Sequence, residues 1–407
     1  MQWRCSFQPK DRPTASTALD PIVAATLDDG LLPTDVLREI LLRLPGKPLC
    51  RLRAVCRSWR SILSDSSFVA AHEARQQPLV AVYTWEPLDL ADVSNKMKPA
   101  DVHILDTSGH LVRQARVGNY VTGHNSNVVC TNLDLLCVEG ADKRLRVLDP
   151  ATGVVSLLPD VVIVNGDEDD YMRYFSMYAV GRDNSSGETK VLAITSEHGM
   201  DSFCSVLTLG DAGGWRKTGY PPTSVLAISP YTALVKGVLY FCVSKGIAAY
   251  DLEKETWRPD LLHLPLPNRA ELFLAELSDS LVAFYNPSDQ ACPTYASLDM
   301  WFLTNSQKDI WSKQYTISMP CQASSNPRDG TTVHPLWSLD DGRIVFWVRQ
   351  GYGGKGAEFT RVYDPTTHTY TDGAEIPTGY SFHAVYKGRL LRSSLHKKLS
   401  MYPSDGT

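Results

Sequence analysis

The apolar positions along the chain follow two different periods, and the change falls near residue 76. From Val36 to Leu44 they recur every three to four residues, which predicts an amphipathic helix that Thr34 is suited to cap. A second helical pattern runs from Leu49 to Leu63, and a third from Phe68 to Arg75. Residues 31–75 are therefore predicted to form a small unit of short helices.

From residue 78 onward the helical period is lost. Short runs rich in Val, Ile, Leu, Tyr and Phe alternate with clusters of Gly, Pro, Asn and Asp, which is typical of an all-β domain. The best candidate for a membrane span is Tyr231 to Tyr250, but Lys236 and Lys245 interrupt it. We expect strands there and no membrane partner.

A repeated unit runs through this β region: a strand that ends in a polar residue, a tight turn, and a returning strand. Aspartate accepts backbone N–H groups in such turns, and proline fixes their geometry. The six copies begin near residues 105, 148, 207, 250, 301 and 363. Their mean spacing of about 52 residues matches a four-stranded β-propeller blade with variable loops. We expect six blades, with five or seven as alternatives, and Leu79 to Trp85 in the last blade, closing the ring.

Composition narrows the class of protein and its chemistry. Apolar residues make up 43% of the 407 residues and charged residues 21%, which suits a globular chain with a sizeable core. A net charge of −5 without a basic stripe argues against nucleic-acid binding. The nine cysteines are irregularly spaced and form no C-x-x-C pair, so we expect free thiols, no metal site, and a reducing compartment, the cytoplasm or the nucleus.

The helical unit has more large apolar side chains than so small a packet can bury. Residues 31–72 also carry a net charge of +4, which leaves −9 for the rest of the chain. Part of this surface is therefore expected to bind a partner, and charge complementarity favours an acidic one.

Residues 31–72 resemble the F-box. The resemblance is carried by Leu32-Pro33, by Leu44-Pro45, by the run Val55-Cys56-Arg57-Ser58-Trp59, and by Phe68 and His72. Pro48 is a mild departure, because the family often has a small polar residue there.

The β region resembles the F-box-associated, kelch-like domains of plant F-box proteins over roughly residues 79–393. Leu148-Asp149-Pro150-Ala151-Thr152-Gly153, Gly237-Val238-Leu239-Tyr240-Phe241 and the run from Asp309 to Ile317 carry this looser match. A double-glycine kelch signature is not evident. The two resemblances together divide the chain into a flexible tail (residues 1–28), an F-box helical domain (29–76) and an all-β propeller domain (77–407).

The resemblance implies a function. F-box proteins are substrate receptors of Skp–cullin–F-box (SCF) ubiquitin ligases, so the helical head would dock a Skp-type adaptor and, through it, a cullin–RING ligase. The propeller would capture a protein substrate for ubiquitination. The family needs no catalytic residue, cofactor or metal ion of its own for this role.

The resemblance also assigns residues. The apolar surface that faces or supports the adaptor would consist of Leu32, Pro33, Ile40, Leu41, Leu44, Leu49, Val55, Cys56 and Trp59. Pro33 and Trp59 are the first choices as anchors, and Leu37 and Leu52 are candidates for the interior. Residues in predicted propeller loops are candidates for substrate contacts, with a solvated acidic loop as the simpler interpretation: Asp167, Glu168, Asp169, Asp170, Tyr171 and Tyr352.

Two other functions stay open. One is a propeller that senses a small molecule or a glycan, as lectins do, and uses the F-box to couple to the ligase. The other is a propeller enzyme. Residues 351–356 match G-x-G-x-x-G, but a dinucleotide site needs a helix next, and Ala357 to Tyr363 predicts a strand. No nucleophile–base pair or metal-ligand spacing supports an enzyme.

Overall fold

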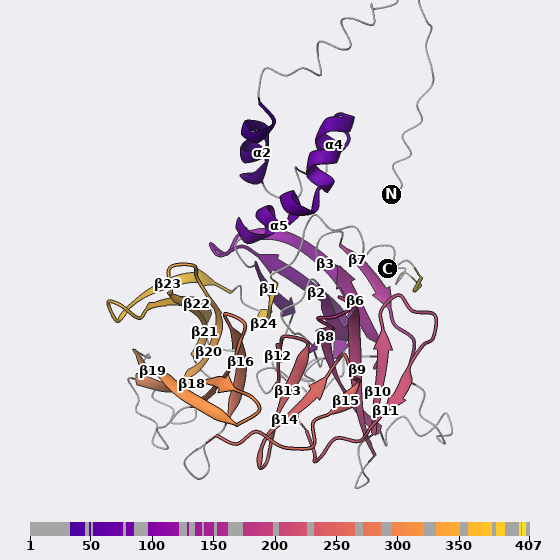
Figure 1. The fold of residues 1–407 in the computed structure, drawn as a ribbon, viewed down its shortest axis with the longest axis vertical. Coiled ribbons are helices and arrows are strands. Elements are labelled where there is room, and N and C mark those ends of the chain that lie inside the picture. The colour runs from indigo at the N-terminus through magenta and orange to yellow at the C-terminus, as the bar shows by residue number, and fades with distance from the viewer. Residues whose placement is uncertain are drawn as a thin grey trace, which may run out of the picture. The chain divides into compact units, whose positions relative to one another are not determined.

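A computed structural model describes most of the chain as two compact units, residues 1–75 and residues 76–407 (Figure 1). The described residues are 33–44, 49, 52–75, 79–84, 97–121, 128–129, 135–140, 142–149, 153–161, 174–197, 203–225, 232–264, 272–285, 295–320, 331–350, 357–376, 380–386, 399 and 401–403. Within these ranges no helix is both long enough and apolar enough to cross a membrane.

The first unit contains the helices α2 (Thr34–Leu42), α4 (Arg57–Ser64) and α5 (Ser66–Arg75), and both α2 and α4 pack against α5. Pro33 is the residue that precedes α2, and no side chain caps that end of the helix. The prediction that Thr34 caps the helix is wrong, because Thr34 already belongs to its first turn.

The ends of α4 and α5 are set by two residues with extended backbones. Cys56 precedes α4 with φ −154°, and its Sγ accepts a hydrogen bond from the Trp59 backbone N–H at 3.4 Å. Asp65 precedes α5 and its carboxylate accepts from the backbone N–H groups of Ser67 (2.8 Å) and Phe68 (3.0 Å). The break predicted before Phe68 is therefore a single extended residue with a capping side chain.

The second unit is built from six antiparallel sheets of four strands each. Blades 1 to 3 are β24 (Tyr380–Tyr386), β1 (Leu79–Thr84), β2 (Met97–Leu105), β3 (Leu111–Val121); β4 (Val128–Val129), β5 (Leu136–Glu139), β6 (Leu145–Asp149), β7 (Val154–Leu157); and β8 (Tyr174–Arg182), β9 (Thr189–Glu197), β10 (Phe203–Thr208), β11 (Arg216–Thr218). Blades 4 to 6 are β12 (Thr232–Val235), β13 (Val238–Val243), β14 (Gly246–Asp251), β15 (Thr256–Trp257); β16 (Phe273–Leu277), β17 (Ser280–Tyr285), β18 (Tyr295–Asn305), β19 (Ile310–Pro320); and β20 (Thr331–Ser338), β21 (Ile344–Gln350), β22 (Ala357–Asp364), β23 (Thr369–Glu375).

Blade 1 joins the two ends of the propeller unit. The C-terminal strand β24 pairs with β1 from Leu79↔Tyr386 to Thr84↔Tyr380. β1 then pairs with β2, so one strand comes from the end of the unit and three come from its start. This confirms a six-bladed propeller and the prediction that the segment from Leu79 closes the ring, with Leu79–Thr84 as the strand described.

The six repeated turns of the sequence are the turns between the third and fourth strands of the six blades. In five of them an aspartate or asparagine side chain accepts a backbone N–H from two residues further on. These pairs are Asp106–Ser108, Asp211–Gly213, Asp251–Glu253, Asn305–Gln307 and Asp364–Thr366. In blade 2 the Gly153 N–H donates to the Asp149 carbonyl oxygen at 2.7 Å.

The core of the propeller lies between neighbouring blades. Between blades 3 and 4, for example, Ile194 packs with Phe241 and Tyr250, and all three are buried. Trp257 of β15 adds its ring against Phe241 and Tyr250, with centroids 5.3 and 5.2 Å away. Trp257 therefore contributes to the core through aromatic packing on its own blade.

Candidate functional site

One face of α2 is fixed to α5 by charged side chains. Arg38 donates a hydrogen bond to Ser67 Oγ at 2.9 Å, and its guanidinium lies 5.6 Å from the centre of the Phe68 ring. Glu39 accepts hydrogen bonds from Arg75 at 3.0 and 3.3 Å, and these bonds lower the pKa of Glu39. These contacts determine which face of α2 remains open to a partner.

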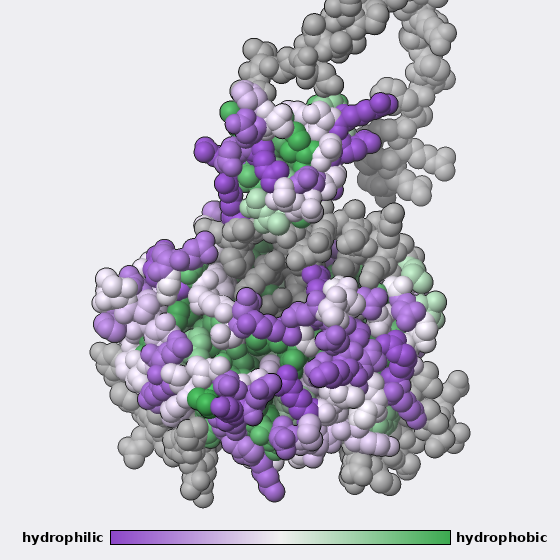
Figure 2. All heavy atoms as spheres, in the orientation of Figure 1, coloured by the Kyte–Doolittle hydropathy of each residue, from purple (hydrophilic) through white to green (hydrophobic). Residues whose placement is uncertain are grey.

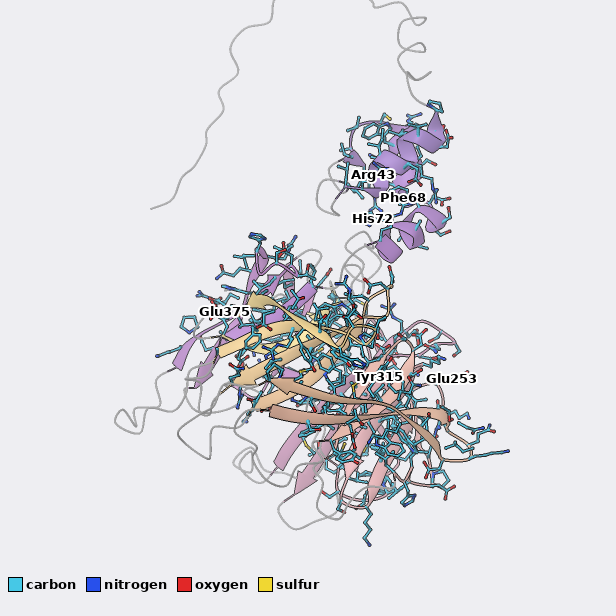
Figure 3. The ribbon with its side chains drawn as sticks, turned by 90° about the vertical axis from the view of Figure 1, so that its left-hand side faces the viewer. Arg43, Phe68, His72, Glu253, Tyr315 and Glu375 are labelled. Atoms are coloured by element: carbon cyan, nitrogen blue, oxygen red, sulfur yellow. The ribbon has the colours of Figure 1, made fainter. Side chains whose placement is uncertain are left out.

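His72 of α5 makes a further contact, with a residue that follows the C-terminal end of α2. Its Nε2 lies 2.8 Å from the carbonyl oxygen of Leu44, which follows α2 and has no partner within the helix. The imidazole is buried and stacked on Phe68, with ring centroids 6.1 Å apart. Figure 3 shows Phe68 and His72 together on α5. These two motif residues thus hold the helices in place and do not face a partner.

The opposite face of α2 presents apolar side chains to solvent. Val36 is 40% exposed and Ile40, one turn later, is 45% exposed; Pro33 is exposed one turn before Val36. Val55, in the turn before α4, is 61% exposed. Figure 2 shows hydrophobic side chains at the surface of this unit, next to hydrophilic ones. The helical unit therefore leaves an apolar surface uncovered.

The predicted adaptor residues differ in exposure. The exposed ones are Pro33, Ile40 and Val55, the half-buried ones are Leu44, Cys56 and Trp59, the buried ones are Leu41 and Leu49, and Leu32 lies outside the described residues. Leu37 and Leu52 are half-buried. Val36 also belongs to the exposed face and was not predicted to, although its place four residues before Ile40 was a signal for it.

The residues predicted to contact the substrate lie outside the described residues, as does the glycine-rich run 351–356. They are Asp167, Glu168, Asp169, Asp170, Tyr171 and Tyr352. Ala357–Asp364 is strand β22, as predicted. Among the side chains that the structure describes, no group of three or more His, Cys, Asp or Glu is placed to hold a metal ion.

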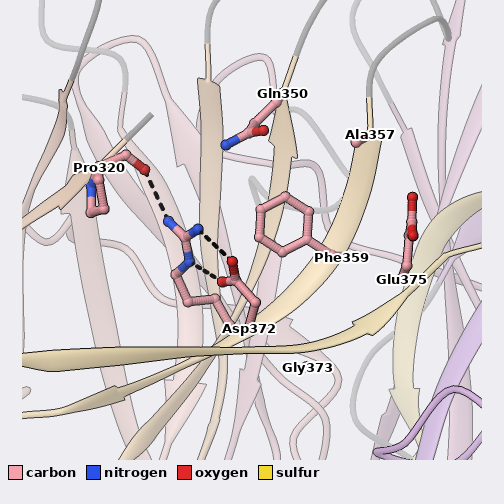
Figure 4. Close-up of a pocket in the computed structure, with 8 residues that line it drawn as sticks. Pro320, Gln350, Ala357, Phe359, Asp372, Gly373 and Glu375 are labelled. Carbon is pink, nitrogen blue, oxygen red and sulfur yellow. Dashed lines mark hydrogen bonds and ion pairs between the residues drawn. The ribbon is translucent and has the colours of Figure 1, made fainter. Parts of the chain in front are cut away.

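A pocket of about 410 Å³ between blades 5 and 6 was not predicted (Figure 4). It is lined by Pro320, Gln350, Ala357, Phe359, Arg361, Asp372, Gly373 and Glu375. Phe359 and Arg361 alternate along β22 and so share one face of the sheet, and the register places Glu375 and Asp372 of β23 opposite them. The bond from Arg361 to the Pro320 carbonyl spans 41 residues of sequence, which is why local patterns did not reveal the site.

Comparison with known families agrees with this architecture. Residues 31–70 match the F-box domain, and residues 110–372 match the F-box associated beta propeller domain. Three Arabidopsis thaliana proteins are similar over most of their length. The F-box protein At4g38870 is 25% identical over 343 residues (79% of this chain, 75% of that protein). The F-box protein At3g23260 is 27% identical over 307 residues (71% and 79%). The F-box/kelch-repeat protein At3g23880 is 24% identical over 330 residues (77% and 84%).

The fold and the family matches point the same way. The F-box match covers the helices whose apolar face is open, and the propeller match spans more than half of the chain. The similar Arabidopsis thaliana proteins are also named as F-box proteins, and one of them as an F-box/kelch-repeat protein. The protein is a plant-type F-box protein, and it belongs to the family that carries an F-box-associated β-propeller domain.

Proposed function

We propose that this protein is the substrate-recognition subunit of an SCF-type ubiquitin ligase. F-box domains generally bind Skp1-type adaptors, and here the F-box would dock such an adaptor and, through it, a cullin–RING ligase. The propeller would capture a protein substrate for ubiquitination. The observation that carries the proposal is the apolar face of α2, which stays exposed while the opposite face is fixed to α5.

The proposed docking surface contains Pro33, Val36, Ile40 and Val55 as direct contacts, with Trp59 of α4 half-buried. Leu41 and Leu49 are buried and would support this surface from beneath. Truncating an apolar anchor that a partner fully covers costs about 2 kcal/mol or more of binding free energy. The net charge of +4 over residues 31–72 would direct the surface toward an acidic partner.

In this role the protein supplies no chemistry. It holds a lysine of the substrate near the ubiquitin-charged conjugating enzyme, and the gain in rate comes from effective concentration. Free cysteines support the proposal that the protein works in the reducing cytoplasm or nucleus; among the described residues, Cys204 and Cys242 are buried and form no disulfide.

The test is co-expression of the full chain with a Skp1-type adaptor, followed by size-exclusion chromatography. We expect a one-to-one complex that Ile40→Glu abolishes, because the change places a charge in the centre of the apolar face. Ile310→Glu is the matched control, since Ile310 is an isoleucine of the propeller with similar exposure, 48% against 45%. A complex that survives Ile40→Glu, or is lost equally in both variants, would refute this docking surface.

A further inference from the structure

The pocket between blades 5 and 6 contains one carboxylate that its own walls leave without a counter-charge. Its charged residues are Arg361, Asp372 and Glu375. The Arg361 side chain is 8% exposed, forms an ion pair with the Asp372 carboxylate through two hydrogen bonds, and donates to the Pro320 carbonyl at 2.9 Å. Asp372 therefore neutralises Arg361, and the pocket keeps a net charge of −1 from Glu375.

Arg361 is also held from the side by two aromatic rings. Its guanidinium carbon lies 5.1 Å from the centre of the Phe359 ring and 5.9 Å from that of Tyr370. The Tyr370 hydroxyl donates to the Ser318 carbonyl of blade 5. These contacts from two blades fix Arg361 as part of the wall, so a ligand meets a preformed surface.

The open part of the pocket is formed by different groups. Glu375 is exposed at the end of β23 and pairs in register with Phe359. The Glu375 side chain forms no hydrogen bond or ion pair with any other residue that the structure describes. Figure 4 shows the Phe359 ring between Asp372 and Glu375, with Gln350 above the ring. A ligand thus encounters a carboxylate, an aromatic ring and a neutral amide.

We propose that this pocket binds a lysine or arginine side chain of a protein ligand. The cationic group would lie at Glu375 and the methylene stem along Phe359, because aromatic rings attract cations and also cover apolar stems. A volume of about 410 Å³ suits one long side chain and its surroundings, and the net charge of −1 disfavours an acidic one. The net charge of −9 outside residues 31–72 would attract basic segments at longer range. The inference rests on the proposed function only in treating this ligand as the substrate.

The test is selection of a random peptide library on the full chain, followed by affinity measurements on the enriched peptides. We expect the enriched peptides to share a lysine or arginine at one position. Replacing that residue by glutamine, or making Glu375→Gln in the protein, should each weaken binding about tenfold, and the two changes together no further. The matched control is Glu253→Gln, an exposed glutamate of the β14–β15 turn, which should leave affinity unchanged; Figure 3 labels both glutamates.

A charge reversal sharpens the test. Glu375→Lys should turn the selection toward acidic peptides, since the new repulsion acts against basic ones. Both variants should keep the melting temperature of the wild type, because the Glu375 side chain is exposed. Enriched peptides without a basic residue, equal affinity for Glu375→Gln, or no enrichment at all would each overturn the proposal. Adaptor binding separates this inference from the proposed function: Glu375→Gln should keep the adaptor complex, and Ile40→Glu should keep peptide binding.

Discussion

We expect Lys190→Met to destabilise the propeller by about 3 kcal/mol, because Lys190 is a buried cation at the joint between blades 3 and 4. Its side chain is 7% exposed, and Nζ donates to the Leu252 carbonyl at 2.7 Å. The same nitrogen lies 2.9 Å from Glu255 Oε1 and 3.6 Å from Asp183 Oδ2. Methionine keeps the length of the side chain and removes its charge.

The magnitude follows from what the substitution leaves behind. Asp183, with its side chain 5% exposed, would lose its buried cation, and Glu255 would keep only Arg216, which donates at 2.7 Å. Breaking a buried pair by removing one partner costs about 3–5 kcal/mol, since the other charge stays buried. We take the lower figure, because serine hydrogen bonds still support Asp183.

The assay is differential scanning calorimetry of the full chain, read at the propeller transition. At about 2.1 cal/mol/K of unfolding entropy per residue, a loss of about 3 kcal/mol in the unit of residues 76–407 lowers its melting temperature by about 4 °C. Lys254→Met is the matched control: its side chain is 73% exposed and 3.8 Å from Asp251, so we expect a change below about 1 °C. Asp183→Asn in the Lys190→Met background should recover part of the loss. Equal melting temperatures for the two methionine variants would refute the reasoning.

Two further predictions concern single side chains. Burial acts to raise the pKa of Asp183, but hydrogen bonds from Ser185 and Ser186 outweigh it and lower the pKa to about 2. The stabilisation is fully present above the unfolded pKa of 3.8 and is lost as the pH falls through about 2. Wild-type protein should therefore lose about 2 kcal/mol between pH 5 and pH 2 that Asp183→Asn does not lose, measured by thermal melts. His72→Ala removes the hydrogen bond to the Leu44 carbonyl and leaves a cavity, which should cost the helical unit about 2–3 kcal/mol and speed its limited proteolysis. No change in that proteolysis would contradict the capping role.

The elements that were predicted correctly from the sequence are those whose physical cause lies in neighbouring residues. An amphipathic period is enough to place α2, because burial on one side of a helix repeats every three to four residues. The turn residues Asp106, Asp251 and Asp364 were found for the same reason, since each bonds to a backbone N–H only two residues away. Counting these turns gave the six blades without any information on strand pairing.

The buried side of the helical unit and the pocket of the propeller were not predicted, because they depend on contacts between residues far apart in the sequence. Which apolar residues of the helical unit are buried was not evident, because Leu41 and the neighbouring Ile40 differ only in which of them faces α5. The ion pair of Arg361 with Asp372 needs β22 and β23 in register, and its bond to Pro320 needs blades 5 and 6 side by side. Such residues look like ordinary surface charges until the ring is assembled.

Consecutive blades are joined by polar bonds that cross from one sheet to the next. The Trp215 indole donates to the Pro159 carbonyl between blades 2 and 3, Lys190 to the Leu252 carbonyl between blades 3 and 4, and Arg361 to the Pro320 carbonyl between blades 5 and 6. Each donor belongs to one blade and each acceptor to its neighbour, so these bonds break when the blades separate. The Arg361 bond differs from the others because the Arg361 side chain also lines the pocket. A ligand bound there would therefore stabilise a joint of the ring, and occupancy of the pocket should raise the melting temperature of the propeller as the ligand concentration rises.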